Sequence, residues 1–297
     1  MRDVLLVAWF ELFRAVRTWR AVALLVLYGV ASAGAAYLFA EFVGLLEQAI
    51  ADQLGVARTE TPGAMMQDLL DSEQLLDVLS AMTGSSGVAE QLLDIPLPAL
   101  FFLWLGFLLV PFFAASASAE CIATDTRTRA IRFELLRTSR LELVLGRFVG
   151  QLLLTAVASA TSAVVMWAVT LWAMTGVPPA PLAGWLAYYA VRTWFFAVPF
   201  VGVGVATSQL TTSSAWARVM AIGLTGGSWV AYGVARWMEE KERVPMLADL
   251  ALQLLPQGWI RDMWSPGMGW LGSAVACSAL GLAAVSLGYL RFHRRDL

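Results

Sequence analysis

Histidine, lysine and cysteine are nearly absent from this sequence. It has one histidine, His293, one lysine, Lys241, and two cysteines. A lone histidine excludes a conventional Ser-His pair and a histidine-rich metal site. The cysteines, Cys121 and Cys277, fall outside the segments that we expect on the extracytoplasmic side, so no disulfide framework is predicted. The sequence therefore indicates neither a catalytic site nor a metal site.

Motifs for nucleotide binding and for hydrolysis are missing as well. The chain has no G-x-x-x-x-G-K-[ST], no H-E-x-x-H and no G-x-S-x-G. The run Gly-Ser-Ser-Gly at 84–87 is a loop signal. A net charge of -2 gives nucleic-acid binding no electrostatic support. We therefore expect that the chain is not an enzyme, that it has no ATP site of its own and that it binds no nucleic acid.

Charge is scarce, and long uncharged runs take its place. Only 14% of the residues are charged, 59% are hydrophobic, and the mean hydropathy is +0.69. Soluble domains carry about 25% charged residues. Because uncharged runs of about 20 residues cross a bilayer as helices, the sequence predicts an all-α integral membrane protein.

Six segments are long enough to cross a membrane. Pro178, Pro179 and Pro181 divide the uncharged stretch 148–191 into two spans, and Pro111 predicts a kink in an earlier one. The predicted spans are residues 21–43, 97–119, 148–175, 183–209, 217–235 and 267–290.

Basic residues predict which side of the membrane each connection faces. Fourteen arginines fall in residues 1–20, in 120–147, at 218 and after 290, against five basic residues in the other connections. The loop 46–95 agrees with this division, since it holds nine acids and one arginine. The excess of arginine predicts that both termini are cytoplasmic.

Residues 1–20 predict an amphipathic helix that lies on the membrane surface. Two alternatives are a plain extension of the first span and a signal peptide that ends near Ala31-Ser32-Ala33. The apolar character continues as far as Leu46, which argues against the signal peptide. On a helical wheel the apolar face holds Leu5, Trp9, Leu12, Phe13, Val16 and Trp19.

The two long extracytoplasmic connections, 44–95 and 236–265, are predicted to contain short helices. Residues 64–80 place leucines and methionines at helical spacings with acids between them. Residues 246–262 predict a second short helix, broken at Pro256. Packing on the outer membrane face and contact with a substrate are both compatible with this pattern.

Arg192 is the charge that lies deepest in a predicted span. It either snorkels to the outer interface or contacts a substrate or partner. No Asp or Glu lies near the middle of a predicted span, which argues against a proton-coupled carrier. Small residues such as Gly202 and Gly204 are interpreted as sites of close helix packing.

The segment 120–147 carries six arginines and four acids between two apolar runs. Asp125, Thr126 and Thr128 offer N-cap chemistry for one helix, and Ser139 offers it for the next. The residues alone leave two interpretations open. The segment is either a surface for a soluble partner or a solvated loop that joins two spans.

The same segment resembles the coupling segment of ABC-2 type transporter permeases. The resemblance extends to the N-terminal surface helix, the six spans and the large loop after the first span. Thr128-Arg129 stands where the family often has Gly-Thr, and no proline precedes Ser139. The residues that carry the resemblance are Asp125, Leu135-Leu136, Ser139-Arg140, Gly146-Arg147 and the ending Arg295-Asp296-Leu297.

This resemblance implies an exporter subunit in the bacterial cytoplasmic membrane, surrounded by lipid. Two permease copies, identical or related, would form the membrane unit. Two separate cytoplasmic ATPase subunits would bind ATP and Mg. The residues expected to contact the ATPase are Asp125, Arg127, Arg129, Arg132, Phe133, Glu134, Leu136 and Arg140.

The resemblance also suggests roles for residues near and inside the spans. Glu120 is expected to form an ion pair with an arginine where the second span leaves the membrane. The residues expected to line the substrate path are Phe101, Trp104, Phe107 and Arg192.

Two other classes of function stay open. A stand-alone channel or secondary transporter would move its substrate without an ATPase. A membrane enzyme or scaffold would need a set of acids, bases or metal ligands that converge within the spans. The sequence does not name the transported substrate.

Overall fold

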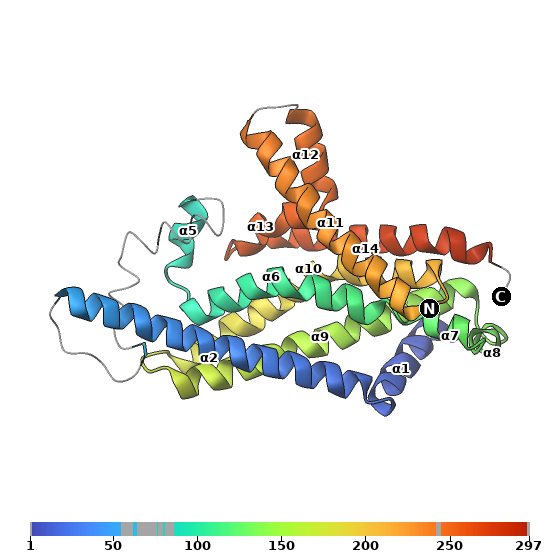
Figure 1. The fold of residues 1–297 in the computed structure, drawn as a ribbon, viewed down its shortest axis with the longest axis horizontal. Coiled ribbons are helices and arrows are strands. Elements are labelled where there is room, and N and C mark those ends of the chain that lie inside the picture. The colour runs from blue at the N-terminus through green and yellow to red at the C-terminus, as the bar shows by residue number, and fades with distance from the viewer. Residues whose placement is uncertain are drawn as a thin grey trace.

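The computed structural model describes residues 2–54, 62–63, 76, 80, 86–241 and 245–295. Every regular element in this part of the chain is helical. Figure 1 shows long helices lying side by side, with α12 (Pro245–Leu254) standing away from them. The predicted all-α class is therefore confirmed for the described residues.

Five helices of the described chain are long and apolar enough to cross a membrane. The predicted span at 217–235 coincides with α11 (Ser214–Glu240), which has 27 residues but is not among the five. The hydropathy of α11 is lowered by its glycines and by the charged residues Arg218 and Arg236. Composition therefore does not confirm the predicted number of six spans. The five are α2 (Arg20–Leu54), α6 (Leu97–Ser118), α9 (Arg140–Ala173), α10 (Pro179–Leu210) and α14 (Trp270–His293).

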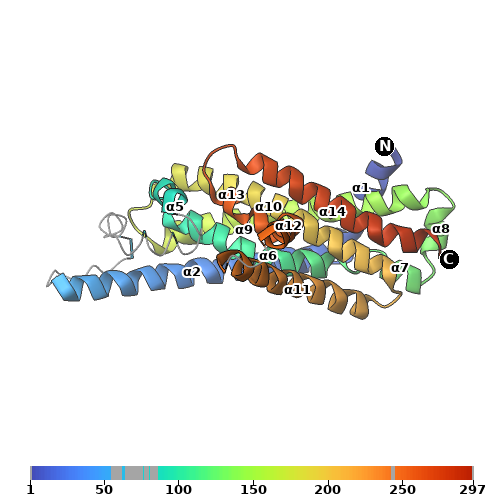
Figure 2. The ribbon, with the colours of Figure 1, turned by 90° about the horizontal axis from the view of Figure 1, so that it is seen from above.

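Helix α10 forms the centre of the bundle and contacts α6, α9 and α14 (Figure 2). Two of its glycines permit this packing. A Cβ atom at Gly202 would collide with the carbonyl oxygen of Gly281, and one at Gly204 would collide with the hydroxyl of Ser118. Glycine at these positions therefore lets α10 approach α14 and α6 closely, as the sequence predicts.

Helix α2 packs along α9 and continues beyond it (Figure 1). The hydroxyl of Ser32 donates a hydrogen bond to the carbonyl oxygen of Ser162 at 2.9 Å. The predicted span ends at residue 43, whereas the helix runs to Leu54. Near its end the carboxylate of Glu47 accepts hydrogen bonds from the amide of Gly63 at 3.0 and 3.1 Å. This contact ties the far end of α2 to the connection that follows it.

Short helices occupy the described parts of the two long connections. The predicted helix at 64–80 lies outside the described residues, apart from Leu76 and Ser80. In the first connection α5 (Ser86–Leu92) leads into α6. In the second, α12 ends before Pro256, where a 3₁₀ turn η1 (Pro256–Trp259) begins, and α13 (Ile260–Trp264) follows.

Helix α1 (Arg2–Arg17) packs on α9 with the face opposite to its apolar one. Trp9 and Phe13 are 62% and 63% exposed, whereas Ala8 on the other side is 1% exposed. The chain turns from α1 into α2 at Trp19, which has a φ of 59°. The apolar face found on the helical wheel therefore points away from the bundle, where a membrane surface would meet it.

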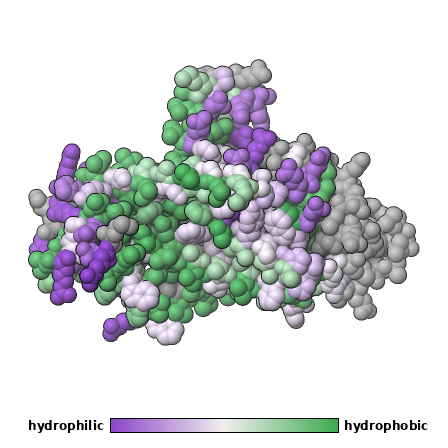
Figure 3. Space-filling model, turned by 180° about the vertical axis from the view of Figure 1, so that it is seen from behind, coloured by the Kyte–Doolittle hydropathy of each residue, from purple (hydrophilic) through white to green (hydrophobic). Residues whose placement is uncertain are grey.

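The α7–α8 end of the bundle carries both termini and many polar residues. Figure 1 places both termini at the end that carries α7 (Ala123–Arg127) and α8 (Ile131–Leu135). Figure 3 shows hydrophobic residues over the middle of the molecule and hydrophilic residues gathered at the α7–α8 end. The polar segment of the sequence thus forms one end of an apolar bundle.

Candidate functional site

The segment between α6 and α9 folds into two short helices, α7 and α8. Arg129 separates them with a φ of 59°. The hydroxyls of Thr126 and Thr128 donate to the carbonyl oxygens of Ile122 and Thr124, at 2.9 and 3.1 Å. The N-cap residues of α7 and α8 are Ile122 and Ala130, and neither helix has a side-chain cap. The prediction that Asp125, Thr126 and Thr128 cap a helix here is therefore wrong.

The second predicted cap is confirmed. The hydroxyl of Ser139 accepts a hydrogen bond from the amide of Glu142 at 3.3 Å. The Glu142 carboxylate in turn accepts one from the amide of Ser139 at 3.0 Å. This reciprocal capping box fixes where α9 starts, directly after α8.

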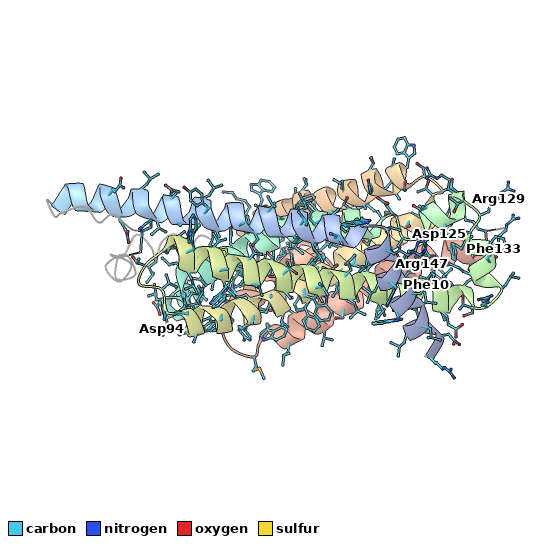
Figure 4. The ribbon with its side chains drawn as sticks, turned by 90° about the horizontal axis from the view of Figure 1, so that it is seen from below. Phe10, Asp94, Asp125, Arg129, Phe133 and Arg147 are labelled. Atoms are coloured by element: carbon cyan, nitrogen blue, oxygen red, sulfur yellow. The ribbon has the colours of Figure 1, made fainter. Side chains whose placement is uncertain are left out.

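Asp125 lies between two guanidinium groups that come from other helices. Both of its carboxylate oxygens accept hydrogen bonds from Arg14 of α1, at 2.5 and 2.6 Å. One oxygen also lies 2.5 Å from Nη2 of Arg147 in α9. Asp125 is 2% exposed and Arg147 is 1% exposed. Figure 4 shows both residues inside the α7–α8 end, with Phe10 of α1 nearby.

Glu134 and Glu11 complete this network. Glu134 of α8 accepts a hydrogen bond from Arg147 at 2.5 Å, and Glu11 accepts one from Gln151 at 3.2 Å. Burial raises the pKa of Glu11 above its usual value, although the nearby arginines oppose the shift. The hydrogen bond to Asp125 raises the pKa of Arg14. The network therefore ties α1, α7, α8 and α9 together through charged side chains.

Two glycines of α9 allow α1 to come this close. A Cβ atom at Gly146 would lie 2.5 Å from the Cβ of Val7, and one at Gly150 would lie 3.0 Å from the Cβ of Glu11. A larger residue at Gly146 would push α1 outward and lengthen the distance between Arg14 and Asp125. The packing of small residues thus sets the geometry of the ion pairs.

The outer surface of α7 and α8 is apolar and basic. Phe133 is 74% exposed and Leu136 is 82% exposed. Figure 4 shows Phe133 and Arg129 pointing away from the bundle. The two acids of this surface segment, Asp125 and Glu134, are instead turned toward Arg147. The exposed arginines around the two apolar side chains are Arg127, Arg129, Arg132 and Arg137.

Arg140 does not lie on this exposed surface. Its Nη1 donates to the carbonyl oxygens of Phe292, His293 and Arg295, at 3.1, 2.8 and 2.9 Å. It therefore caps the C-terminal end of α14, where helix carbonyls carry partial negative charge. Arg295 in turn donates to the carbonyl oxygen of Gln209 at 3.1 Å, which ties in the end of α10.

The other predicted positions fall elsewhere in the bundle. Glu120 forms an ion pair with Arg218 of α11. Phe101 stacks on Phe39, with 4.7 Å between ring centroids, and on Trp104 at 5.9 Å. Trp104 is 39% exposed on this face of α6.

Phe107 points into the core instead. It packs on Phe196 and Trp264, with centroid distances of 4.9 and 5.7 Å. The structure therefore brings Phe101 and Trp104 together and separates Phe107 from them.

Arg192 is enclosed by protein and is 0% exposed. Its Nη1 donates to the carbonyl oxygen of Met263 at 2.6 Å. Its Nη2 contacts the hydroxyl of Tyr188 and lies 3.2 Å from the carbonyl oxygen of Gly267. The guanidinium group also sits 4.1 Å from the centroid of the Tyr188 ring. Arg192 thus joins α10 to the connection between α13 and α14.

Sequence reasoning missed the roles of Arg14, Glu11 and Arg147. Arg14 and Glu11 come from α1, which is distant in sequence from Asp125, and Arg147 comes from α9, at the end of the same segment 120–147. One signal was available, because Arg14 and Glu11 lie on the charged face of the N-terminal helix. If the apolar face of this helix contacts lipid, the charged face must pack on protein or contact water.

Comparison with known proteins assigns the chain to a family. The family model described as ABC-2 family transporter protein matches residues 5–297. A comparison with individual curated proteins gives no match. Permeases of this family generally work with ABC ATPase partners. Because the match covers nearly the whole chain, and because several helices are apolar enough to cross a membrane, the chain belongs to the ABC-2 family of transporter proteins as a multi-pass permease of an ABC transporter.

Proposed function

We propose that this permease is an export subunit and that the exposed surface of α7 and α8 receives force from a separate cytoplasmic ATPase. Two permease copies, identical or related, would bind two ATPase subunits, which would hold ATP and Mg. The observation that carries the proposal is the exposed pair Phe133 and Leu136 above the buried Asp125–Arg147 ion pair.

The exposed pair favours a protein partner. Exposed apolar area costs about 25 cal/mol per Å², so large apolar side chains that stand together on a polar end mark a binding surface. The arginines around Phe133 and Leu136 favour a partner whose apolar socket has an acidic rim. We therefore assign the contact to Phe133, Leu136, Arg127, Arg129, Arg132 and Arg137, and not to Arg140.

The buried network gives this surface a rigid support. A push on α8 reaches α9 through Glu134 and Arg147, and it reaches α1 through Asp125 and Arg14. Salt bridges that are enclosed in protein have little freedom to rearrange, so the displacement passes to the helices. This arrangement suits a segment that transmits movement better than it suits a solvated loop.

The positions of the termini support six crossings. Both termini lie at the α7–α8 end, as an even number of spans would place them (Figure 1). The helices α2, α6, α9, α10 and α14 account for five, so α11 supplies the remaining one. The excess of arginine at the α7–α8 end supports a cytoplasmic location for that end in a bacterial inner membrane.

The test removes the apolar contact without touching the buried network. We expect the double variant Phe133→Ala/Leu136→Ala to lose co-purification of the ATPase and stimulation of ATP hydrolysis. The matched control is Phe42→Ala/Leu45→Ala in α2, where the same residue types are 57% and 64% exposed at the same spacing. Co-purification of the ATPase at the unmodified level with the first variant would contradict the proposal.

A further inference from the structure

A cavity of about 970 Å³ lies between α1, α8 and α9 at the α7–α8 end. Its lining combines arginines from three segments with exposed aromatic side chains of α1. Of the residues assigned to the ATPase contact, Arg137 lines the cavity, whereas Phe133 and Leu136 do not. The cavity therefore lies beside the proposed ATPase contact and shares Arg137 with it.

The cavity carries unpaired positive charge. Of the arginines that line it, Arg14 and Arg147 are paired with Asp125 and Glu134. Arg17 and Arg137 are exposed and form no ion pair within the described chain. Glu11 also lines it, and the four arginines of the lining still outnumber its three acids. The lining therefore attracts an anion.

One donor at the base of the cavity has no partner. Arg147 is 1% exposed, and its Nη1 makes no hydrogen bond with any described residue. A buried donor left without an acceptor is costly, and nearly all such donors in proteins are satisfied by a neighbour, water or a ligand. An oxygen-rich anion in the cavity would meet this donor.

Helix α1 also contributes apolar side chains to the cavity. Trp9, Phe10 and Phe13 of α1 line it and are 62 to 63% exposed. Phe10 and Arg147 both line the cavity, and Figure 4 shows them at the same end of the bundle. Tryptophan and arginine on one amphipathic helix are typical of the membrane interface, where a lipid offers both an anionic headgroup and an acyl chain.

We propose that this cavity binds the phosphate-bearing headgroup of an anionic membrane lipid. Arg17 and Arg137 hold the phosphate at the rim, and Nη1 of Arg147 donates to it from below. The acyl chains lie beside Trp9 and Phe13. The lipid would bridge α1 and α8, and its binding does not require the ATPase.

The test measures lipid binding to the full-length purified chain in neutral detergent. Fluorescent phosphatidylglycerol is titrated against the protein, with phosphatidylcholine as the zwitterionic comparison. We expect Arg17→Gln/Arg137→Gln to bind phosphatidylglycerol roughly thirtyfold more weakly, since each basic residue near a lipid surface contributes about a fivefold gain in affinity.

The matched control is Arg291→Gln/Arg294→Gln, which removes the same charge from exposed positions outside the cavity. This control is expected to keep the affinity of the unmodified chain. An equal loss in both double variants would overturn the proposal, because it would reflect general attraction by the arginines of this end. Equal affinity of the unmodified chain for the two lipids would overturn it as well.

A further arm separates a lipid from a free anion. Glycerol phosphate carries the headgroup chemistry without acyl chains. We expect it not to displace phosphatidylglycerol at equal concentrations, because it cannot use the aromatic wall. Displacement at equal concentrations would overturn the lipid assignment and identify a site for soluble phosphate.

Discussion

Asp125 and Arg147 form an ion pair that is almost completely enclosed, with 2.5 Å between carboxylate oxygen and guanidinium nitrogen. Arg14 holds the same carboxylate from the other side. Enclosed charges are costly unless they are paired, so each member of this group depends on the others. This buried ion pair therefore lies directly behind the surface that we assign to the ATPase contact.

Asp125→Asn should lower the stability of the permease. The substitution leaves Arg14 and Arg147 without their shared carboxylate, and breaking an enclosed pair costs about 3 kcal/mol. Thermal unfolding of the purified chain in detergent measures the loss. The control is Asp3→Asn, an exposed acid of α1, which should change stability by less than about 0.5 kcal/mol. Equal unfolding temperatures for the two variants would argue against a structural role for the ion pair.

Gly146→Ala should destabilise the contact between α1 and α9. The new methyl group would lie 2.5 Å from the Cβ of Val7, and overpacking of this kind costs about 1–3 kcal/mol. Faster hydrogen exchange in residues 2–17 would report the loosened helix. Gly272→Ala in α14 is the control, because no atom lies within 4 Å of its added Cβ. Unchanged exchange in α1 would mean that the close approach is not required.

Glu11→Gln should change how the stability of the permease depends on pH. Burial raises the pKa of Glu11 in the folded chain above the usual value of 4.5, so the ionised carboxylate opposes folding. The free energy of unfolding therefore rises as pH falls through the raised pKa, and this gain is complete below the unfolded pKa. Glutamine keeps the hydrogen bond to Gln151 available and does not ionise.

The measurement is the difference in unfolding temperature between the two proteins from pH 4 to pH 8. We expect the glutamine variant to be the more stable at pH 8 and the difference to shrink toward pH 4. A constant difference across this range would contradict the assignment of the effect to Glu11.

Arg192→Met should loosen the connection between α13 and α14. The variant keeps a long apolar side chain but leaves the carbonyl oxygens of Met263 and Gly267 without their donor. Loss of a hydrogen bond to a charged group costs about 1.5–3 kcal/mol. Hydrogen exchange in residues 260–269 should accelerate, whereas Arg261→Met, at an exposed position, should leave it unchanged. The opposite pattern would remove Arg192 from this role.

Local features of the permease could be predicted from sequence better than contacts between distant segments. Ser139 and Glu142 of the capping box are three positions apart, so their pattern is visible in the chain itself. The amphipathic face of α1 was visible for the same reason. That the charged face would pack on α9 in particular depended on Gly146 and Gly150, and helical periodicity in α1 carries no information about these two glycines.

Side chains with several possible partners were the hardest to predict. Arg140 lies in a motif that the family resemblance assigns to ATPase contact, yet it bonds to carbonyl oxygens at the end of α14. Arg192 was predicted to reach the outer interface or a ligand, and in the structure its two terminal nitrogens donate to the backbone carbonyl oxygens of Met263 and Gly267. Arginine forms such bonds with any nearby oxygen, so its partner is set by the tertiary fold.

The bonds of Arg140 and Arg295 have a mechanical consequence. Arg140, the first residue of α9, is hydrogen-bonded to the last turn of α14, and Arg295 links the end of α14 to the last turn of α10. These hydrogen bonds connect the three helices at the α7–α8 end. Helix α11 is attached to that end by the Glu120–Arg218 pair, and Arg218 is 52% solvent-exposed. A displacement of α8 at the proposed ATPase contact would therefore move α9, α14 and α10 together, whereas α11 meets this end through a separate ion pair.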